Sequence, residues 1–591
     1  MDLKAACDGH HFASAEATNA SWQAIGLCVL LIVFSTLSLS ANLQKSPTAD
    51  ENYHLVAGYS YLLWRDYRIN PEHPPLAKLL AALPLLGIDI NNQPLTQKRR
   101  DEVQVNGRYG WLLANQWLFS NNDAEELLFY AKLPMIALGA MLGLLVFCWA
   151  RELYGQTAAF ASLALYVFDP NILAHSAIIH TDLPFALTFC AGTYYFWRTA
   201  KEVTWFNWLM TIGFFALSAV TKFSFVIILP IWSVLAFCLV FSSTPIRSRI
   251  TSVSEITGRW HKAGLLAAIF VSAIMLAYLT IWLAYGFRYD AVGGQVERLM
   301  IPSGITPSPW LMPWVPLNAK YHLLPEAWFY GLVYALSTFN RTAYLLGEIS
   351  GQGFLLYFPI AFATKTPLST LLLLIIALIL FLEKNELNKD FKFLLIPILL
   401  FVSFAVLSRM NIGLRHILPV YPFLFVWLGG SVKTLWSSRS LARKSTALLL
   451  VIWLVCSSIN TYPDYLAFFN EAVGSRNRHQ ILVDSNLDWG QDLKGLKRWM
   501  DENDVGKIRL AYFGTADPAY YGIDAIPQPE AWSSEPQSDN TLPGPAYIAI
   551  SATHLASLYF WPSKPYERYL DSEPEAIIGG SIHVYKIRDR R

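Results

Sequence analysis

About eleven apolar segments, each close to the length that crosses a bilayer, constrain this chain more than any other feature. The 591 residues are 54% hydrophobic and only 15% charged, whereas an ordinary soluble protein is nearer a quarter charged. The sequence therefore predicts a mainly α, polytopic membrane protein. The segments lie near residues 22–40, 127–150, 157–173, 176–197, 205–220, 222–242, 263–285, 353–382, 392–408, 413–432 and 446–462.

Lysine and arginine residues gather in the short connections on one side of these segments. Because such loops are typically cytoplasmic, the loops 41–126 and 286–352 and the tail after residue 462 are predicted to lie outside. We interpret the first segment as an uncleaved anchor, with a cleaved signal peptide as the alternative. The basic residues that set this orientation are Arg198, Lys201, Arg247, Arg249, Arg259, Lys262, Lys433, Arg439, Arg443 and Lys444.

Residues 463–591 differ from the rest of the chain because polar residues become common. ILVDSN, the amphipathic DLKGLKRWMDEN, KIRLAYF and AYIAIS follow one another in a strand–helix–strand pattern, with a Pro/Ser-rich insert before AYIAIS. We therefore predict two parts: a transmembrane domain over residues 1–462 and an extracytoplasmic α/β domain over residues 463–591.

Several function classes are disfavoured by the sequence. The formal net charge is only +2 and no basic stripe with interleaved aromatic residues occurs, so no nucleic-acid partner is expected. No glycine-rich nucleotide-binding loop is present. The six cysteines lie in the N-terminal tail or in apolar segments and form no CxxC motif, which disfavours a disulfide framework.

The stretch TADENYHL and the EHPPLAK motif that follows it place ionisable groups just beyond the first apolar segment. The double proline Pro74–Pro75 cannot continue a helix from upstream and is predicted to begin a new one, with Lys78 about one turn in. An anionic head group there would meet backbone N–H groups as well as Lys78. The alternative is that the prolines only shape a surface helix and Lys78 reaches back to the membrane interface.

Ionisable residues from distant segments are predicted to share the outer face. Any one of them alone is readily explained as an interfacial residue. Together they suit a site that takes a charged substrate from the membrane. They are Asp50, Glu51, Glu72, His73, Lys78, Asp169, His175, His180, Asp182, Lys222, Arg415 and His416.

These residue types fit transfer from a lipid-phosphate donor. A carboxylate can act as a general base on an acceptor, while lysine and arginine stabilise a departing phosphate. A transporter or flippase of lipid-linked saccharides is the alternative, although the charges are expected at one face rather than at mid-membrane. A receptor or structural protein would explain the tail but not EHPPLAK.

Four motifs resemble those of the protein O-mannosyltransferase and aminoarabinose-transferase superfamily, which has the GT-C fold. They are ADENYH, HPPLAK, HTDLPFALTF at 180–189 and AVTKFSF at 219–225, and NIGLRHILPVYPFL extends the resemblance to about residue 430. DSNLDWGQDL at 484–493 is similar to a motif of bacterial glycosyltransferases that use a phospholipid carrier. The resemblance implies a polyprenyl-phosphate sugar donor and an acceptor that is a protein, a lipid or a glycan.

The resemblance also implies roles for individual residues. Asp50 would be the catalytic base with Glu51 beside it, and Asp182 would support the site. Lys222 and Arg415 would bind the carrier phosphate, in an inverting single displacement. The further substrate-binding candidates are Glu72, His73, Lys78 and His416. The implied location is the cell membrane, as in a bacterial inner membrane, with the site on the extracytoplasmic face.

A metal cofactor is not expected. In the aminoarabinose branch the position of Glu72 belongs to a metal-associated site, but the following residue here is His73, as in the mannosyl branch. A divalent metal would need a ligand besides Glu72, such as His180 or His175.

Overall fold

The structure is a computed structural model. It describes residues 3–105, 107–120, 122–250, 253–292, 308–338, 341–383, 389–474, 477–529 and 546–587, without the side chains of residues 3–20, 103–105, 107 and 108.

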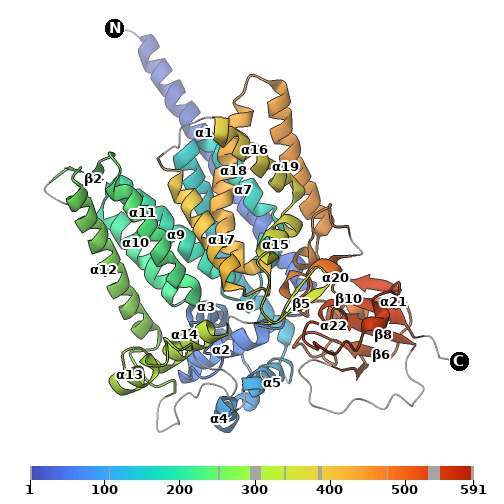
Figure 1. Cartoon of the computed structure of the whole chain (residues 1–591). Coiled ribbons are helices and arrows are strands. Elements are labelled where there is room, and N and C mark those ends of the chain that lie inside the picture. The colour runs from blue at the N-terminus through green and yellow to red at the C-terminus, as the bar shows by residue number, and fades with distance from the viewer. Residues whose placement is uncertain are drawn as a thin grey trace.

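Long helices stand roughly parallel and form the larger part of the molecule (Figure 1). Six of the described helices are long and apolar enough to cross a membrane, and eight if each of two bent pairs is one span. The helices of this part are α1 (Leu3–Leu43), α6 (Ala124–Tyr154), α7 (Gln156–Val167), α9 (Asp182–Lys201), α10 (Trp205–Ala219), α11 (Ile228–Val240), α12 (Arg259–Ala284), α16 (Leu368–Glu383), α17 (Lys392–Ser408), α18 (Tyr421–Trp436) and α19 (Leu441–Thr461).

Short helical turns extend or break these spans. In one bent pair, α7 meets α8 (Pro170–Ser176) with a bend of 65°. In the other, α15 (Tyr357–Lys365) meets α16 with a bend of 111°. Every predicted apolar segment falls on a helix, but α9, α10 and α17 do not pass the same test of length and composition, so the number eleven stays a prediction. The short elements are α8 (Pro170–Ser176), η3 (Phe223–Ile227), α15 (Tyr357–Lys365) and η4 (Leu414–Val420).

The outward face of α12 is apolar and exposed. Ile274, Met275 and Leu283 are each more than half exposed. In water such a continuous stripe is unfavourable, whereas it suits contact with lipid tails. The predicted class, a mainly helical multi-pass membrane protein, is confirmed.

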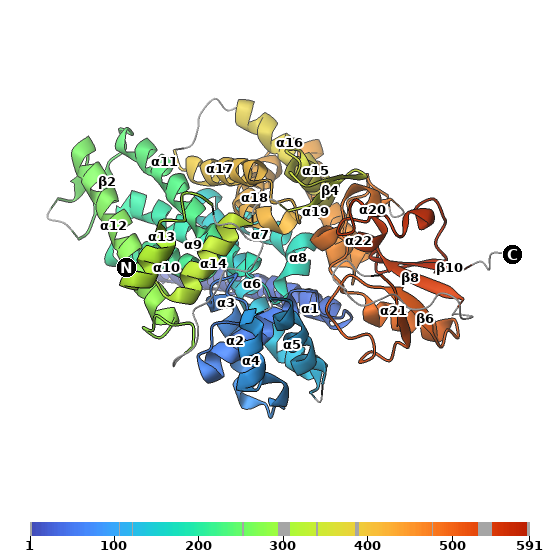
Figure 2. The same cartoon turned by 60° about the horizontal axis from the view of Figure 1, so that its bottom comes forward.

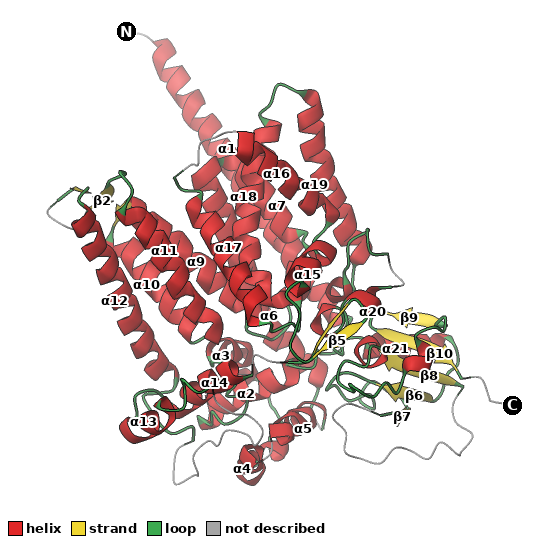
Figure 3. Ribbon diagram, in the orientation of Figure 1, coloured by secondary structure: helices red, strands yellow, loops and turns green. Residues whose placement is uncertain are grey.

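The two ends of the helical layer differ in what they carry (Figure 3). One end holds a small sheet of β1 (Glu202–Val203), β2 (Ile246–Ser248) and β3 (Glu255–Ile256). The other end holds α2 (Glu51–Trp64), α3 (Leu76–Ala82), η1 (Leu83–Gly87), η2 (Gln93–Leu95), α4 (Gln97–Val105), α5 (Gly107–Phe119), α13 (Trp314–Tyr321), α14 (Glu326–Ser337) and the hairpin β4 (Ala343–Leu345) to β5 (Glu348–Ser350). The loops predicted to share one side therefore do so.

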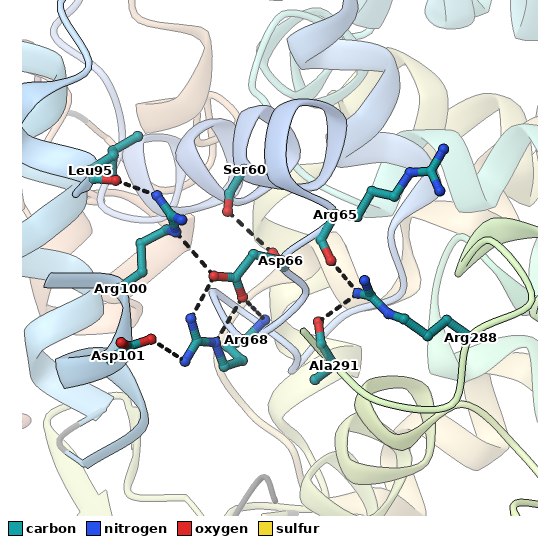
Figure 4. Close-up of polar contacts among 9 residues, drawn as sticks. All are labelled: Ser60, Arg65, Asp66, Arg68, Leu95, Arg100, Asp101, Arg288 and Ala291. Carbon is teal, nitrogen blue, oxygen red and sulfur yellow. Dashed lines mark hydrogen bonds and ion pairs between the residues drawn. The ribbon is translucent and has the colours of Figure 1, made fainter. Parts of the chain in front are cut away.

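A buried carboxylate organises the loop between α2 and α4 (Figure 4). Asp66 is fully buried and accepts from Arg68 Nη2 at 2.7 Å and from Arg100 Nε at 3.1 Å. Arg68 also pairs with Asp101 at 2.7 Å. Because a buried charge is costly without partners, these pairs fix the loop that leads from α2 to the EHPPLAK segment.

The C-terminal part contains a five-stranded sheet beside the helical layer (Figure 2). The strand order is β7-β6-β8-β10-β9, with β6 parallel to β7 and β8 and the remaining pairs antiparallel. The elements are α20 (Arg478–Ile481), α21 (Leu493–Glu502), β6 (Ile508–Ala511), β7 (Ala525–Pro527), β8 (Tyr547–Ser551), α22 (Ala552–Leu555), β9 (Ala576–Ile578) and β10 (Ile582–Lys586), with 3-10 turns η5 (Tyr465–Ala467), η6 (Asp484–Asn486) and η7 (Glu567–Tyr569).

Most of the C-terminal pattern is confirmed. The predicted helix is α21, and the strands KIRLAYF and AYIAIS contain β6 and β8. Strands β7, β9 and β10 were not predicted. Most of the Pro/Ser-rich insert, residues 530–545, lies outside the described residues, and the boundary at residue 463 stays a prediction.

The predicted strand ILVDSN is wrong. Its first residue ends α20, and Asp484 has a φ of 56°, which a β-strand cannot accommodate. Its polar groups bond outside the sheet: the N–H of Asp484 donates to Thr553 Oγ1 at 3.0 Å. Local β propensity is overridden here by contacts to distant segments.

Candidate active site

Two carboxylates and two cations from four distant segments meet at the end of the helical layer that carries α2 and α3. Asp50 is the N-cap of α2, and Asp182 is the first residue of α9. Lys222 precedes η3, and Arg415 is the second residue of η4. The sequence predicted this convergence.

Asp182 lies at the centre of the group. It is almost fully buried and is paired with Lys222 Nζ. Its Oδ2 is 3.4 Å from Arg415 Nη1 and 3.2 Å from His180 Nδ1. The same Arg415 nitrogen lies 3.7 Å from Oδ2 of Asp50. One guanidinium therefore connects the two carboxylates.

The side chain of Asp50 has fewer contacts than that of Asp182. Its side chain makes no capping hydrogen bond to α2 and is about a quarter exposed, at 24%. Burial raises the pKa of the Asp50 carboxyl above the ordinary 3.8, and the positive charge of Arg415 opposes that rise. A carboxylate that is weakly held and has a raised pKa is suited to accept a proton.

Glu51 is engaged elsewhere. One of its oxygens accepts from the N–H of Thr48 at 2.7 Å, and the other accepts from the N–H of Ile179 at 3.2 Å and lies 3.4 Å from Lys132 Nζ. These contacts join the start of α2 to the turn before α9. The Glu51 carboxylate therefore fixes the chain directly beside Asp50.

The Lys78 ammonium is hydrogen-bonded to oxygen atoms of the chain itself. A helix does begin at the double proline, as predicted, but α3 starts at Leu76 with Pro75 as its N-cap, so the prolines precede the helix instead of forming its first turn. However, Lys78 is buried, and its ammonium donates to the carbonyls of Asn70 at 2.6 Å and His73 at 2.7 Å and to Tyr61 Oη at 2.9 Å. The ammonium therefore closes the loop between α2 and α3.

Glu72 lies beside two residues that the sequence did not indicate. The hydroxyl of Tyr334 in α14 is hydrogen-bonded to Glu72, and Arg341 faces both Glu72 and Asp50 electrostatically. Burial raises the pKa of the Glu72 carboxyl, which Arg341 counteracts. No motif distinguishes Arg341 in the sequence, because only the fold brings its loop to the site.

Histidines surround the two carboxylates. The rings of His54 and His73 are 5.3 Å apart, and those of His175 and His180 are 5.2 Å apart. His180 Nδ1 accepts a hydrogen bond from the N–H of Asp182 at 2.8 Å. His416 in η4 is the fifth histidine near these carboxylates. Among the described residues, no group of three histidine, cysteine or acidic side chains is placed to hold a metal ion.

The C-terminal segment Asp484–Leu493 also reaches this site. Ser485 Oγ accepts from Arg415 Nε at 3.2 Å, and the Arg415 guanidinium lies 4.2 Å from the centroid of the Trp489 ring. This is the DSNLDWGQDL motif, whose role the sequence alone does not give.

The family comparison agrees with the sequence motifs. Residues 124–282 match the family model described as dolichyl-phosphate-mannose-protein mannosyltransferase. This match confirms the resemblance to GT-C glycosyltransferases. It includes Asp182 and Lys222 but neither Asp50 nor Arg415. No curated protein sequence matches the chain.

Two solved GT-C proteins are among the structures that align with the chain. ArnT from Cupriavidus metallidurans bound to undecaprenyl phosphate aligns at 10% identity and a TM-score of 0.44, covering 95% of this chain and 97% of that chain. The apo Archaeoglobus fulgidus oligosaccharyltransferase aligns at 11% identity and a TM-score of 0.41, covering 74% of this chain. The chain spans 56% of the length of that archaeal protein.

Proposed function

We propose that this chain is an integral membrane glycosyltransferase that moves a sugar from a polyprenyl-phosphate carrier to an acceptor on the extracytoplasmic face. The observation that carries the proposal is the connected group Asp50, Arg415, Asp182 and Lys222, which joins a proton acceptor to two phosphate-binding cations. The match of residues 124–282 to a mannosyltransferase family model supports the same class of reaction.

The proposed reaction is a single displacement. Asp50 takes the proton from the hydroxyl or amine of the acceptor, and the acceptor atom then attacks the anomeric carbon of the donor. The bond between that carbon and the phosphate oxygen breaks, and the phosphate leaves with the electron pair. Because phosphate is already a good leaving group, one base carboxylate is sufficient and no covalent enzyme intermediate is required.

Lys222 and Arg415 would stabilise the phosphate as its charge increases. Both cations are held by Asp182, so their positions are fixed before the donor binds. Cations that are already in place need little rearrangement during the reaction. This preorganisation accounts for most of the transition-state stabilisation at such sites. The acceptor, whether a protein, a lipid or a glycan, would approach from the side of Asp50.

The stereochemistry of the product tests the mechanism. Purified protein should convert a polyprenyl-phosphate sugar of known anomeric configuration into a product of opposite configuration, as measured by NMR of the new glycosidic bond. Retention of configuration would contradict a single displacement by the acceptor.

Donor affinity should depend on both cations. Replacing Lys222 by Met or Arg415 by Met should each weaken donor binding by about 1.5–3 kcal/mol, the typical value of a charge-assisted hydrogen bond. If both touch the same phosphate, the double variant should depart from additivity in a binding titration.

Lys320→Met is a matched control, because Lys320 lies in the last turn of the peripheral helix α13 and its replacement should leave donor affinity unchanged. Unaltered affinity in both single variants, measured on folded protein, would remove Lys222 and Arg415 from the phosphate site.

The pH dependence of turnover should report Asp50. Below its pKa Asp50 is protonated and cannot act as a base, so kcat/KM should fall with decreasing pH, with a midpoint above 3.8 because burial raises that pKa. Since Arg415 lowers the Asp50 pKa, Arg415→Met should move the midpoint to higher pH. Rate profiles between about pH 4 and pH 8 measure both effects. A downward movement in the variant would contradict the assignment.

A further inference from the structure

The DSNLDWGQDL segment, residues 484–493, contacts the two parts of the site that carry Asp50 and Arg415. These parts are more than 300 residues apart along the chain. The segment therefore lies where it can set the position of the base and of the phosphate-binding cation at once.

The first set of contacts holds the loop that leads to Asp50. The carbonyl of Trp489 accepts from the N–H of Ala49 at 2.8 Å, and the carbonyl of Gln491 accepts from the N–H of Ser46 at 2.9 Å. The side chain of Asp492 accepts from Lys45 Nζ at 2.6 Å. The residue immediately before Asp50 is thus bonded directly to Trp489.

The second set holds the segment that carries Arg415. Asn486 Oδ1 accepts from the N–H of Leu414 at 2.9 Å. Ser485 Oγ donates to the carbonyl of Ile412 and accepts from Arg415 Nε. The packing is so close that a Cβ atom on Gly413 would lie 2.3 Å from Ser485 Oγ, which explains the glycine there.

The segment is itself fixed to the C-terminal sheet. Asp488 Oδ2 accepts from the N–H of Thr553 at 2.9 Å, in the helix α22 that follows β8. Asp492 Oδ2 accepts from Ser581 Oγ at 2.6 Å, directly before β10. Asp484 accepts from the hydroxyl of Tyr559. These anchors are almost fully buried, so the segment is a rigid extension of the sheet.

We infer that Trp489 is a positioning residue of the active centre, through which the C-terminal sheet sets the separation between Asp50 and Arg415. This inference rests on the proposed function. The backbone carbonyl of Trp489 accepts from the N–H of Ala49, and the Trp489 ring makes a cation–π contact with the Arg415 guanidinium. The C-terminal part is then a component of the catalytic unit, because the site is incomplete without it.

Substitution of the ring separates this role from general packing. Trp489→Leu retains the backbone contact to Ala49 but removes the aromatic face, and turnover of a polyprenyl-phosphate sugar should fall about 10-fold or more. Trp489→Phe restores a face and should recover turnover to within about threefold of the wild type. Trp499→Leu is the matched control: this tryptophan of α21 packs on Tyr547, and its loss should leave turnover unchanged.

A double-mutant cycle tests whether the ring acts through Arg415. In an Arg415→Met background, Trp489→Leu should change turnover by less than about twofold, because the cation that the ring holds is already absent. An equal loss in both backgrounds would overturn the inference. Ser485→Ala provides a second variant if Trp489→Leu does not fold. It removes the contacts of Ser485 Oγ to Arg415 Nε and to the Ile412 carbonyl, keeps the Trp489 ring, and should lower turnover in the same non-additive way.

The outcomes also distinguish the two proposals. Normal turnover by Trp489→Leu and Ser485→Ala, with an active wild type, would overturn the positioning role and leave the proposed function standing. A wild type that releases no carrier phosphate with any acceptor would overturn both.

Discussion

Asp50→Asn should reduce turnover by about 100-fold or more, because asparagine has nearly the same volume but cannot accept the proton of the acceptor. Thermal stability should change little, since the Asp50 side chain makes no capping hydrogen bond and its nearest cation is 3.7 Å away. Single-turnover rates and thermal unfolding on the same preparation measure the two effects.

Asp123→Asn is a suitable control for Asp50→Asn. Asp123 also caps a helix, α6, but it lies outside the group of charges described for the site. Asparagine is an equally good N-cap, so this variant should be normal in both assays. Near-normal turnover by Asp50→Asn would show that Asp50 is not the catalytic base.

Asp182→Ala should be among the most destabilising single changes in the protein. It removes the buried partner of Lys222 and one of the two carboxylates near Arg415. Breaking a buried ion pair from one side leaves an uncompensated charge, at a cost of about 3–5 kcal/mol. The midpoint of thermal unfolding should therefore fall clearly in detergent or in nanodiscs.

Two further variants identify the cause of that loss. Adding Lys222→Met to Asp182→Ala removes the stranded ammonium and should restore part of the stability. Asp501→Ala breaks the exposed pair with Lys497, where Asp501 is 63% exposed, and should change stability by less than about 0.5 kcal/mol. If Asp182→Ala were as stable as Asp501→Ala, the central role of Asp182 would be contradicted.

The convergence of Asp50, Asp182, Lys222 and Arg415 could be predicted because it depends on two robust signals. Apolar segments alternate across the membrane, and basic loops set their direction. Once those are known, charged residues at the ends of alternate segments must share a face. The helix after Pro75 and the strands β6 and β8 were predicted for similarly local reasons.

The roles of single side chains were harder to predict because they depend on which partner each group finds. A lysine one turn into a helix fits a phosphate site, but Lys78 instead meets the carbonyls of a neighbouring loop. ILVDSN has strand propensity, but its backbone bonds to distant segments. Trp489 lies in DSNLDWGQDL, a motif whose role the sequence alone does not give, and Arg341 lies in no motif. Both reach the site only through the fold.

The most direct test of the account is whether the purified protein cleaves the donor. Reconstituted wild-type protein, given a polyprenyl-phosphate sugar and membrane extract as a source of acceptor, should release free polyprenyl phosphate in proportion to the glycosylated product. The Asp50→Asn protein in the same vesicles should release about one hundredth as much or less. Movement of intact donor across the vesicle membrane with no release of polyprenyl phosphate would contradict the transferase and favour a flippase.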